Sequence, residues 1–136
     1  MRFSGVSMDK KKILIIDDDK VVLESLRRLL ELHSYEALAV QEAGEAFSKA
    51  KSFNPDVILL DLLMPRLGGL EICEMLNSDK ETRGIPIIVV SALDKEADIK
   101  KAYRLGVVGY ITKPYDLNKL LQEINKAIAY KQEDLA

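Results

Sequence analysis

The chain of 136 residues contains no tryptophan, one cysteine and one histidine. A single cysteine, Cys73, cannot form a disulfide within the chain and is typical of a protein from a reducing compartment. No apolar run approaches the roughly 20 residues that a membrane-spanning helix needs, and the N-terminal MRFSGVS lacks the apolar centre of a signal peptide. The sequence therefore excludes a disulfide scaffold and favours a cytoplasmic protein that has no membrane partner.

The chain also lacks an excess of charge of either sign. Its 20 basic and 22 acidic residues give a net charge of −2 and form no basic block, so nucleic acid is not an expected direct partner. Hydrophobic residues make up 48% and charged residues 31%, which is typical of one globular domain. We expect a flexible leader at residues 1–9, a domain at 10–131 and a short tail at 132–136.

Short aliphatic runs alternate with stretches of helical periodicity along the whole chain. The runs predict strands at residues 13–16, 37–40, 57–60, 87–90 and 107–111, and the periodic stretches predict helices at about 20–33, 42–52, 68–78, 94–105 and 116–130. Most runs are continuous and β-branched, as buried parallel strands are, whereas 37–40 is weaker and suits a sheet edge. The alternation predicts an α/β fold in which a doubly wound parallel sheet of five strands is covered by helices on both faces.

Chemically active side chains directly follow four of the five predicted strands. They are Asp17, Asp18 and Asp19 after the first strand, Asp61 after the third, Ser91 after the fourth and Lys113 after the fifth. The carboxyl ends of parallel strands share one edge of the sheet, where ligands bind in such folds. Clustered carboxylates suit Mg²⁺, and a carboxylate can attack a phosphoryl group whose oxygens a hydroxyl and a lysine would stabilise.

Each of these residues has an ordinary explanation when it is taken alone. The aspartates at 17–19 are about equally well explained as helix caps, Ser91 as a turn residue and Lys113 as a surface lysine. Their occurrence at the ends of four strands of one sheet favours the functional interpretation. We expect His33 to cap a helix or lie at the surface, and Cys73 to belong to the core.

One alternative comes from the stretch IIDDDKVV, which resembles the first motif of haloacid-dehalogenase-type phosphatases. That resemblance implies Asp17 as the nucleophile and Asp19 as the acid/base. These enzymes need a further pair of acids after the lysine, but Lys113 is followed only by Pro114, Tyr115 and the last helix. The phosphatase also leaves Asp61 without a role, so we keep it as the second hypothesis.

The segments KILIIDDDK, DVILLDLLMPRLGGLE, IPIIVVSA and GYITKPY resemble, in order and spacing, the motifs of the receiver domain of bacterial response regulators, the CheY-like family. The resemblance covers roughly residues 10–130. It implies a flavodoxin-like three-layer sandwich with strand order 2-1-3-4-5. It also implies a phosphorelay signalling protein that catalyses only its own aspartyl phosphorylation and dephosphorylation.

The resemblance assigns a role to each residue of the predicted site. Asp61 would be the phosphoacceptor, charged from a phosphohistidine on a sensor histidine kinase or a histidine phosphotransfer protein. Mg²⁺ would be bound by Asp17, Asp18, Asp61 and the backbone carbonyl of Leu63. Asp17 would act directly or through water, and Asp19 would cap the first helix. Lys113 would contact the phosphoryl group, and the Lys113–Pro114 bond is expected to be cis.

The family also has a conformational switch. Ser91 matches its switch hydroxyl and Tyr110 matches the aromatic residue that moves with it, while the downstream target would bind roughly residues 94–130. The weak apolar face of the 94–105 helix fits either a movable element or a merely exposed one. Leu63 and Leu93 stand where polar residues often orient the attacking water, so we expect a long-lived phosphoaspartate. A stand-alone receiver and a part of a longer regulator both remain open.

Overall fold

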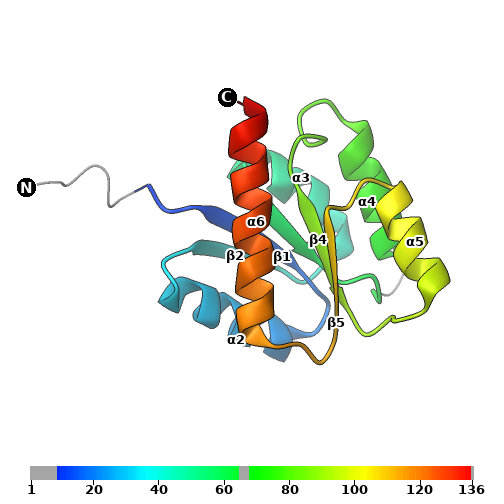
Figure 1. Ribbon diagram of the computed structural model, residues 1–136, viewed down its shortest axis with the longest axis horizontal. Coiled ribbons are helices and arrows are strands. Elements are labelled where there is room, and N and C mark those ends of the chain that lie inside the picture. The colour runs from blue at the N-terminus through cyan, green and yellow to red at the C-terminus, as the bar shows by residue number, and fades with distance from the viewer. Residues whose placement is uncertain (1–8, 65–67, 136) are drawn as a thin grey trace, which may run out of the picture.

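The computed structural model describes residues 9–64 and 68–135, and for residues 132–135 it describes the backbone alone (Figure 1). The sheet consists of β1 (Lys12–Ile16), β2 (Glu36–Val40), β3 (Val57–Leu60), β4 (Ile87–Ser91) and β5 (Gly109–Thr112). The helices are α2 (Lys20–Leu32), α3 (Ala43–Phe53), α4 (Gly69–Ser78), α5 (Glu96–Arg104) and α6 (Leu117–Leu135). All neighbouring strands are parallel, in the order β2-β1-β3-β4-β5. The predicted α/β class, the strand order and the edge position of β2 are confirmed.

Alternate residues of each strand supply two separate hydrophobic cores, one on each face of the sheet. Ile13 and Ile15 of β1 belong to the core beneath α2 and α6, whereas Leu14 and Ile16 belong to the core beneath α3, α4 and α5. Figure 1 shows α2 and α6 crossing one face of the sheet. These four side chains are 2% exposed or less, and burial of each stabilises the fold by about 1.5–3 kcal/mol. The continuous apolar runs thus reflect strands that are buried on both sides.

Most predicted bounds differ from the observed ones by one or two residues, and two of the differences have a clear physical reason. The last strand begins at Gly109 rather than at residue 107, because Gly106 turns the chain with a φ of 101° and the N–H of Val107 still bonds the carbonyl of Ala102 in α5. The last helix runs to Leu135 instead of ending near residue 130. Its apolar stripe fades after Ile128, but the following residues include neither glycine nor proline and most are good helix formers. Residues 132–135, expected as a tail, therefore continue α6, whereas residues 1–8 of the expected leader lie outside the described part.

Several smaller expectations are confirmed. Cys73 is fully buried in the core on the α3–α5 side, and His33 is the exposed residue that ends α2. The Lys113–Pro114 peptide bond is cis. No helix in the described ranges is long and apolar enough to cross a membrane.

Candidate functional site

The four predicted strand ends meet at one edge of the sheet. The strand ladder continues one residue past the regular strands: Asp61 donates its N–H to the carbonyl of Ile16 at 3.0 Å, and Lys113 donates its N–H to the carbonyl of Ser91 at 2.8 Å. Asp17 likewise bonds the carbonyl of Val40 at 3.2 Å. The backbones that carry these side chains are therefore fixed by the sheet, although the residues lie 44 and 52 positions apart in sequence.

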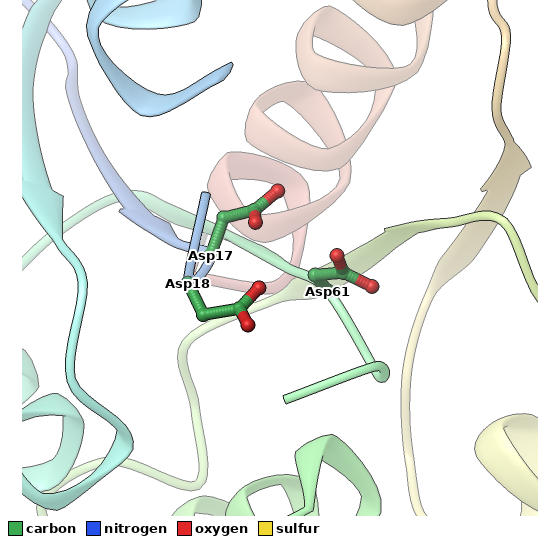
Figure 2. A group of neighbouring side chains, drawn as sticks. All are labelled: Asp17, Asp18 and Asp61. Atoms are coloured by element: carbon green, nitrogen blue, oxygen red, sulfur yellow. The ribbon is translucent and has the colours of Figure 1, made fainter. Parts of the chain in front are cut away.

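Three carboxylates form the centre of this edge (Figure 2). One oxygen from each of Asp17, Asp18 and Asp61 lies within 4.8 Å of the other two. Asp17 is 4% exposed and Asp61 6% exposed, while Asp18 is half-buried. Oxygen ligands at this spacing suit a hard divalent cation, so the cluster predicted from the sequence is present in the fold.

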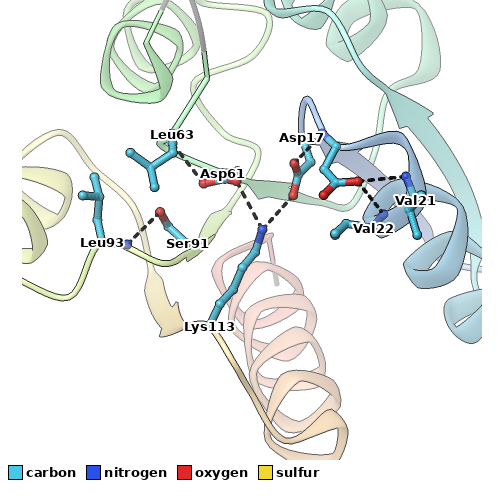
Figure 3. Close-up of polar contacts among 9 residues, drawn as sticks. Asp17, Val21, Val22, Asp61, Leu63, Ser91, Leu93 and Lys113 are labelled. Atoms are coloured by element: carbon cyan, nitrogen blue, oxygen red, sulfur yellow. Dashed lines mark hydrogen bonds and ion pairs between the residues drawn. The ribbon is translucent and has the colours of Figure 1, made fainter.

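The Lys113 ammonium lies between two of these carboxylates (Figure 3). Its Nζ donates to Asp17 Oδ2 at 2.9 Å and to Asp61 Oδ2 at 3.2 Å. The side chain of Lys113 is 24% exposed, whereas those of Asp17 and Asp61 are 6% and 8% exposed. One positive charge thus faces three negative charges in a largely desolvated space, which leaves an excess of negative charge.

Burial and charge act in opposite directions on the ionisable groups. Burial raises the pKa of Asp17, and the nearby Asp61 charge adds to this, while the bonds from the Asp19 N–H and from Lys113 lower it without reversing the shift. Burial alone would lower the pKa of Lys113, but the bond and charge of Asp17 together with Asp61 raise it. The lysine therefore stays charged, and Asp17 holds its charge less readily than a solvated aspartate does.

Backbone N–H groups orient the carboxylates. The N–H of Asp19 donates to Asp17 Oδ1 at 3.0 Å, and the N–H of Leu63 donates to Asp61 Oδ1 at 2.9 Å. Asp19 itself accepts bonds from the N–H groups of Val21 and Val22, so its predicted role as the N-cap of α2 is confirmed. Of the three adjacent aspartates, Asp17 and Asp18 therefore belong to the carboxylate cluster and Asp19 caps α2.

The two predicted switch residues, Ser91 and Tyr110, both hydrogen-bond to the backbone of Leu93. Ser91 is fully buried, and its Oγ accepts the N–H of Leu93 at 3.2 Å. The Tyr110 hydroxyl, which is half-buried, donates to the carbonyl of Leu93 at 2.6 Å. Sequence reasoning singled out Leu93 only for its side chain and missed this backbone link, because no residue type marks a main-chain contact.

Gly69 was also missed as a residue that shapes the site. A Cβ atom there would lie 2.4 Å from the Cα of Leu62 and 2.6 Å from the carbonyl oxygen of Asp61. Only a residue without a side chain lets α4 start this close to the backbone of Asp61 and Leu62. The sequence signal that could have identified it is the pair Gly68-Gly69 shortly after Asp61. Pro65, which lies between Asp61 and this pair in the sequence, is outside the described residues.

Comparison with known proteins agrees with this geometry. The model of the response regulator receiver domain matches residues 13–125. Protein PilH of Pseudomonas aeruginosa is 37% identical over 118 residues, which cover 87% of this chain and 98% of PilH. The response regulator MprA of Mycolicibacterium vanbaalenii is 39% identical over 110 residues, or 81% of this chain, and the match spans 47% of MprA. The chain thus spans nearly all of PilH and about half of MprA.

Solved structures give the same result. A CheY-like response regulator receiver domain protein from Methanospirillum hungatei superposes with a TM-score of 0.86 at 28% identity, covering 93% of this chain and 99% of that one. The receiver domain of a signal transduction histidine kinase from Syntrophus aciditrophicus has a TM-score of 0.80 at 28% identity, with coverages of 88% and 90%. The haloacid-dehalogenase alternative gains no support. The family match spans both the aspartate cluster and the lysine that pairs with it, and the chain belongs to the response regulator receiver domain family.

Proposed function

We propose that this receiver domain accepts a phosphoryl group on Asp61 from a phosphohistidine of a sensor histidine kinase or a histidine phosphotransfer protein. The observation that supports this best is Lys113, whose ammonium contacts Asp61 Oδ2 at 3.2 Å while also bonding Asp17. A phosphoryl group on Asp61 would therefore form within reach of the positive charge of Lys113. The protein signals in this way and does not turn over an external substrate.

Mg²⁺ would be held by Asp17, Asp18, Asp61 and the backbone carbonyl of Leu63. The donor set fits because Mg²⁺ prefers oxygen ligands and because the cluster carries more negative charge than Lys113 can neutralise. When bound, Mg²⁺ supplies positive charge that offsets the phosphoryl oxygens. Asp18 is the most accessible of the three acids and is suited to be a direct ligand.

In the transfer step, a carboxylate oxygen of Asp61 attacks the phosphorus atom of the donor. A P–O bond forms, the P–N bond to the imidazole breaks, and its electron pair leaves with the histidine nitrogen. Lys113 can turn from the carboxylate to a phosphoryl oxygen and offset its charge. The N–H of Leu63 keeps the other oxygen of Asp61 in place, since it already bonds Oδ1 at 2.9 Å.

The switch would run through Leu93. If Ser91 turns its hydroxyl toward a phosphoryl oxygen, Oγ leaves the N–H of Leu93, whose carbonyl holds the Tyr110 hydroxyl. Loss of the bond between Leu93 and Ser91 frees the backbone of Leu93, and this weakens the bond from the Tyr110 hydroxyl to the Leu93 carbonyl. The side chains of Ser91 and Tyr110 therefore change position together. This is a shift between two populations, biased by contacts to the phosphoryl group.

The target-binding surface is proposed over roughly residues 94–130. Ala102 is the buried residue of α5, so this helix is held by few apolar contacts and can move at low cost. Tyr103 on the same helix is 48% exposed and gives a partner an aromatic contact. The partner is a protein, with no direct role for nucleic acid or membrane, and the site of action is the cytoplasm.

The test is modification by acetyl phosphate and Mg²⁺, followed by intact-protein mass and peptide mapping. Asp61→Asn should abolish the added phosphoryl group. Asp56→Asn is the matched control, because Asp56 lies just before the same strand, and an asparagine there can still accept the N–H of Lys12. The control should be modified like the wild type.

Two results would contradict the proposal. Stoichiometric modification that persists in Asp61→Asn and maps to Asp17 would favour the phosphatase-like nucleophile. Multiple turnover of p-nitrophenyl phosphate, lost in Asp17→Asn, would show an enzyme acting on external phosphoesters.

A further inference from the structure

A second hollow lies at the other end of β4 and β5 from the carboxylates. Its lining includes Pro86 and Ile88 at the start of β4, Val108 just before β5, and Ala127 and Tyr130 on α6. Ser91 and Lys113 of the proposed phosphorylation site lie at the opposite ends of these two strands, and the carboxylates lie at the same edge of the sheet. This hollow is therefore separate from the site described above.

The hollow has the size and walls of a small-molecule site. Its volume is about 440 Å³, within the range of roughly 300–1,000 Å³ that is usual for ligand pockets. Ile88 and Ala127 are 1% and 7% exposed and form apolar walls, while Val108 and Tyr130 are 47% and 70% exposed and leave apolar surface open to a ligand. The combination is an apolar interior with an aromatic ring at the rim.

Two of the lining positions carry no side chain. Gly84 and Gly106 both line the hollow, and a Cβ atom added at Gly84 would meet no atom within 4 Å. Gly106 has a φ of 101°, a conformation that side-chain-bearing residues rarely adopt. A large side chain at Gly84 would have open space to enter, whereas at Gly106 a Cβ atom would lie 2.9 Å from the side chain of Asn77 and would strain the turn that precedes β5.

The charges around the hollow are mainly positive, although the whole chain carries −2. Among the side chains that the structure describes, its lining contains Arg83, Lys126 and Lys131 and one acid, Glu123. Glu123 Oε2 is bound by the Nζ of Lys126 at 3.2 Å, so the acid is already compensated. The remaining field favours a ligand with negative charge.

We propose that this hollow binds a small organic anion with an apolar ring, of the class of aromatic carboxylates. The ring lies against Pro86, Val108 and Tyr130, and the carboxylate faces Arg83 and Lys131. The proposal does not depend on phosphorylation of Asp61, because the two sites share no lining residue and the test is run on unphosphorylated, Mg²⁺-free protein.

The test uses 2-naphthoate as the probe, with 2-naphthylmethylamine and 2-naphthalenemethanol as cationic and neutral controls of the same ring. Binding is followed by the backbone amide shifts of ¹⁵N-labelled protein. The naphthoate should shift the amides of Gly84, Gly106 and Val108 saturably, with a Kd on the order of 1 mM or below. The amine should bind at least about tenfold more weakly, and the alcohol should fall between the two.

Two kinds of variant locate the site. Gly84→Phe should fill the hollow and abolish binding, whereas Gly44→Phe is the matched control, since an added Cβ at Gly44 on α3 also meets nothing within 4 Å. The Arg83→Glu, Lys131→Glu double variant should weaken naphthoate binding by at least about tenfold and remove the preference over the amine. Circular dichroism and thermal unfolding confirm that each variant is folded.

Three outcomes would overturn the proposal. The first is the absence of saturable shifts at the amides of Gly84, Gly106 and Val108. The second is equal binding of naphthoate and the neutral alcohol, which would leave the cations without a role. The third is unchanged binding in Gly84→Phe, which would place the probe elsewhere.

Discussion

Replacement of Asp18 by asparagine should stabilise the Mg²⁺-free protein. Asp18 contributes a carboxylate oxygen within 4.8 Å of oxygens from both Asp17 and Asp61. The Lys113 Nζ bonds those two acids and, among the described contacts, no cation bonds Asp18. In the absence of a metal, Asp18 therefore adds repulsion that the amide would not.

The size of the effect follows from the distances. Two unit charges at this separation repel by about 0.9 kcal/mol at the dielectric constant of water and by about 1.7 kcal/mol at half that value. Asp18 faces two such charges, and attraction by Lys113 offsets about one of them. The net gain in the free energy of unfolding is about 1 kcal/mol, which raises Tm by roughly 3–5 °C in a domain of this size.

The assay is urea unfolding in EDTA at low ionic strength, repeated with Mg²⁺. Wild-type protein should gain about 1.4 kcal/mol at Mg²⁺ ten times above Kd, and Asp18→Asn should lose most of this gain. Added sodium chloride should reduce the difference in EDTA, because salt screens the half-exposed charge.

Asp19→Asn is the matched control, because Asp19 is adjacent and exposed and caps α2, a role that asparagine fills equally well. Its stability should be nearly unchanged, with and without Mg²⁺. The reasoning is refuted if Asp18→Asn is less stable than the wild type in EDTA, or if it keeps the full stabilisation by Mg²⁺.

Three further predictions concern the acyl phosphate, the core thiol and pH. Leu63→Asn and Leu93→Glu should each accelerate autodephosphorylation of the phosphorylated protein by about tenfold, the value of one added hydrogen bond of about 1.4 kcal/mol to the attacking water; a time course on phosphate-affinity gels with no acceleration in either variant would contradict this. Burial raises the pKa of Cys73 from 9.0 to about 12, so the thiolate fraction at pH 8 falls roughly a thousandfold. Iodoacetamide should thus label the folded protein far more slowly than the urea-unfolded protein, as mass spectrometry will show, and similar rates would mean that the thiol is accessible. Because burial raises the pKa of Asp17 above 3.8, the folded state favours its protonated form. Protonated Asp17 therefore contributes to the free energy of unfolding below pH 3.8, and this contribution is lost as pH rises through the pKa of the folded state. In urea unfolding of Mg²⁺-free protein at stepped pH, Asp17→Asn should not show this loss of stability. An identical pH dependence in both proteins would exclude Asp17 as the source.

The fold was largely predictable, because most strands contain an unbroken apolar run that is followed by polar residues. That pattern alone places Asp17, Asp61, Ser91 and Lys113 at one edge of a parallel sheet. The end of α6 was not predictable from the apolar stripe, since the last turns extend on helix propensity after the stripe fades near Ile128.

The contacts within the site were less predictable than its composition. The family resemblance implies that Lys113 meets a phosphoryl group, but its sharing between two acids depends on side-chain separations that have no sequence pattern. The link through Leu93 consists of main-chain atoms, which every residue type carries. The second hollow depends on which glycines face a common space, and spacing along the chain does not reveal that.

The position of Lys113 has a consequence for metal binding at the site. Its ammonium occupies oxygens that a divalent cation would also use, so the lysine and Mg²⁺ compete for Asp17 and Asp61. If Mg²⁺ binds as proposed, this competition would lower the affinity of the resting protein for the metal below that of three bare carboxylates. The two ion pairs of Lys113 would then be weaker in the metal-loaded protein, and its ammonium would be freer to turn toward a phosphoryl oxygen. The same two ion pairs would therefore set both the affinity for Mg²⁺ and the freedom of the lysine.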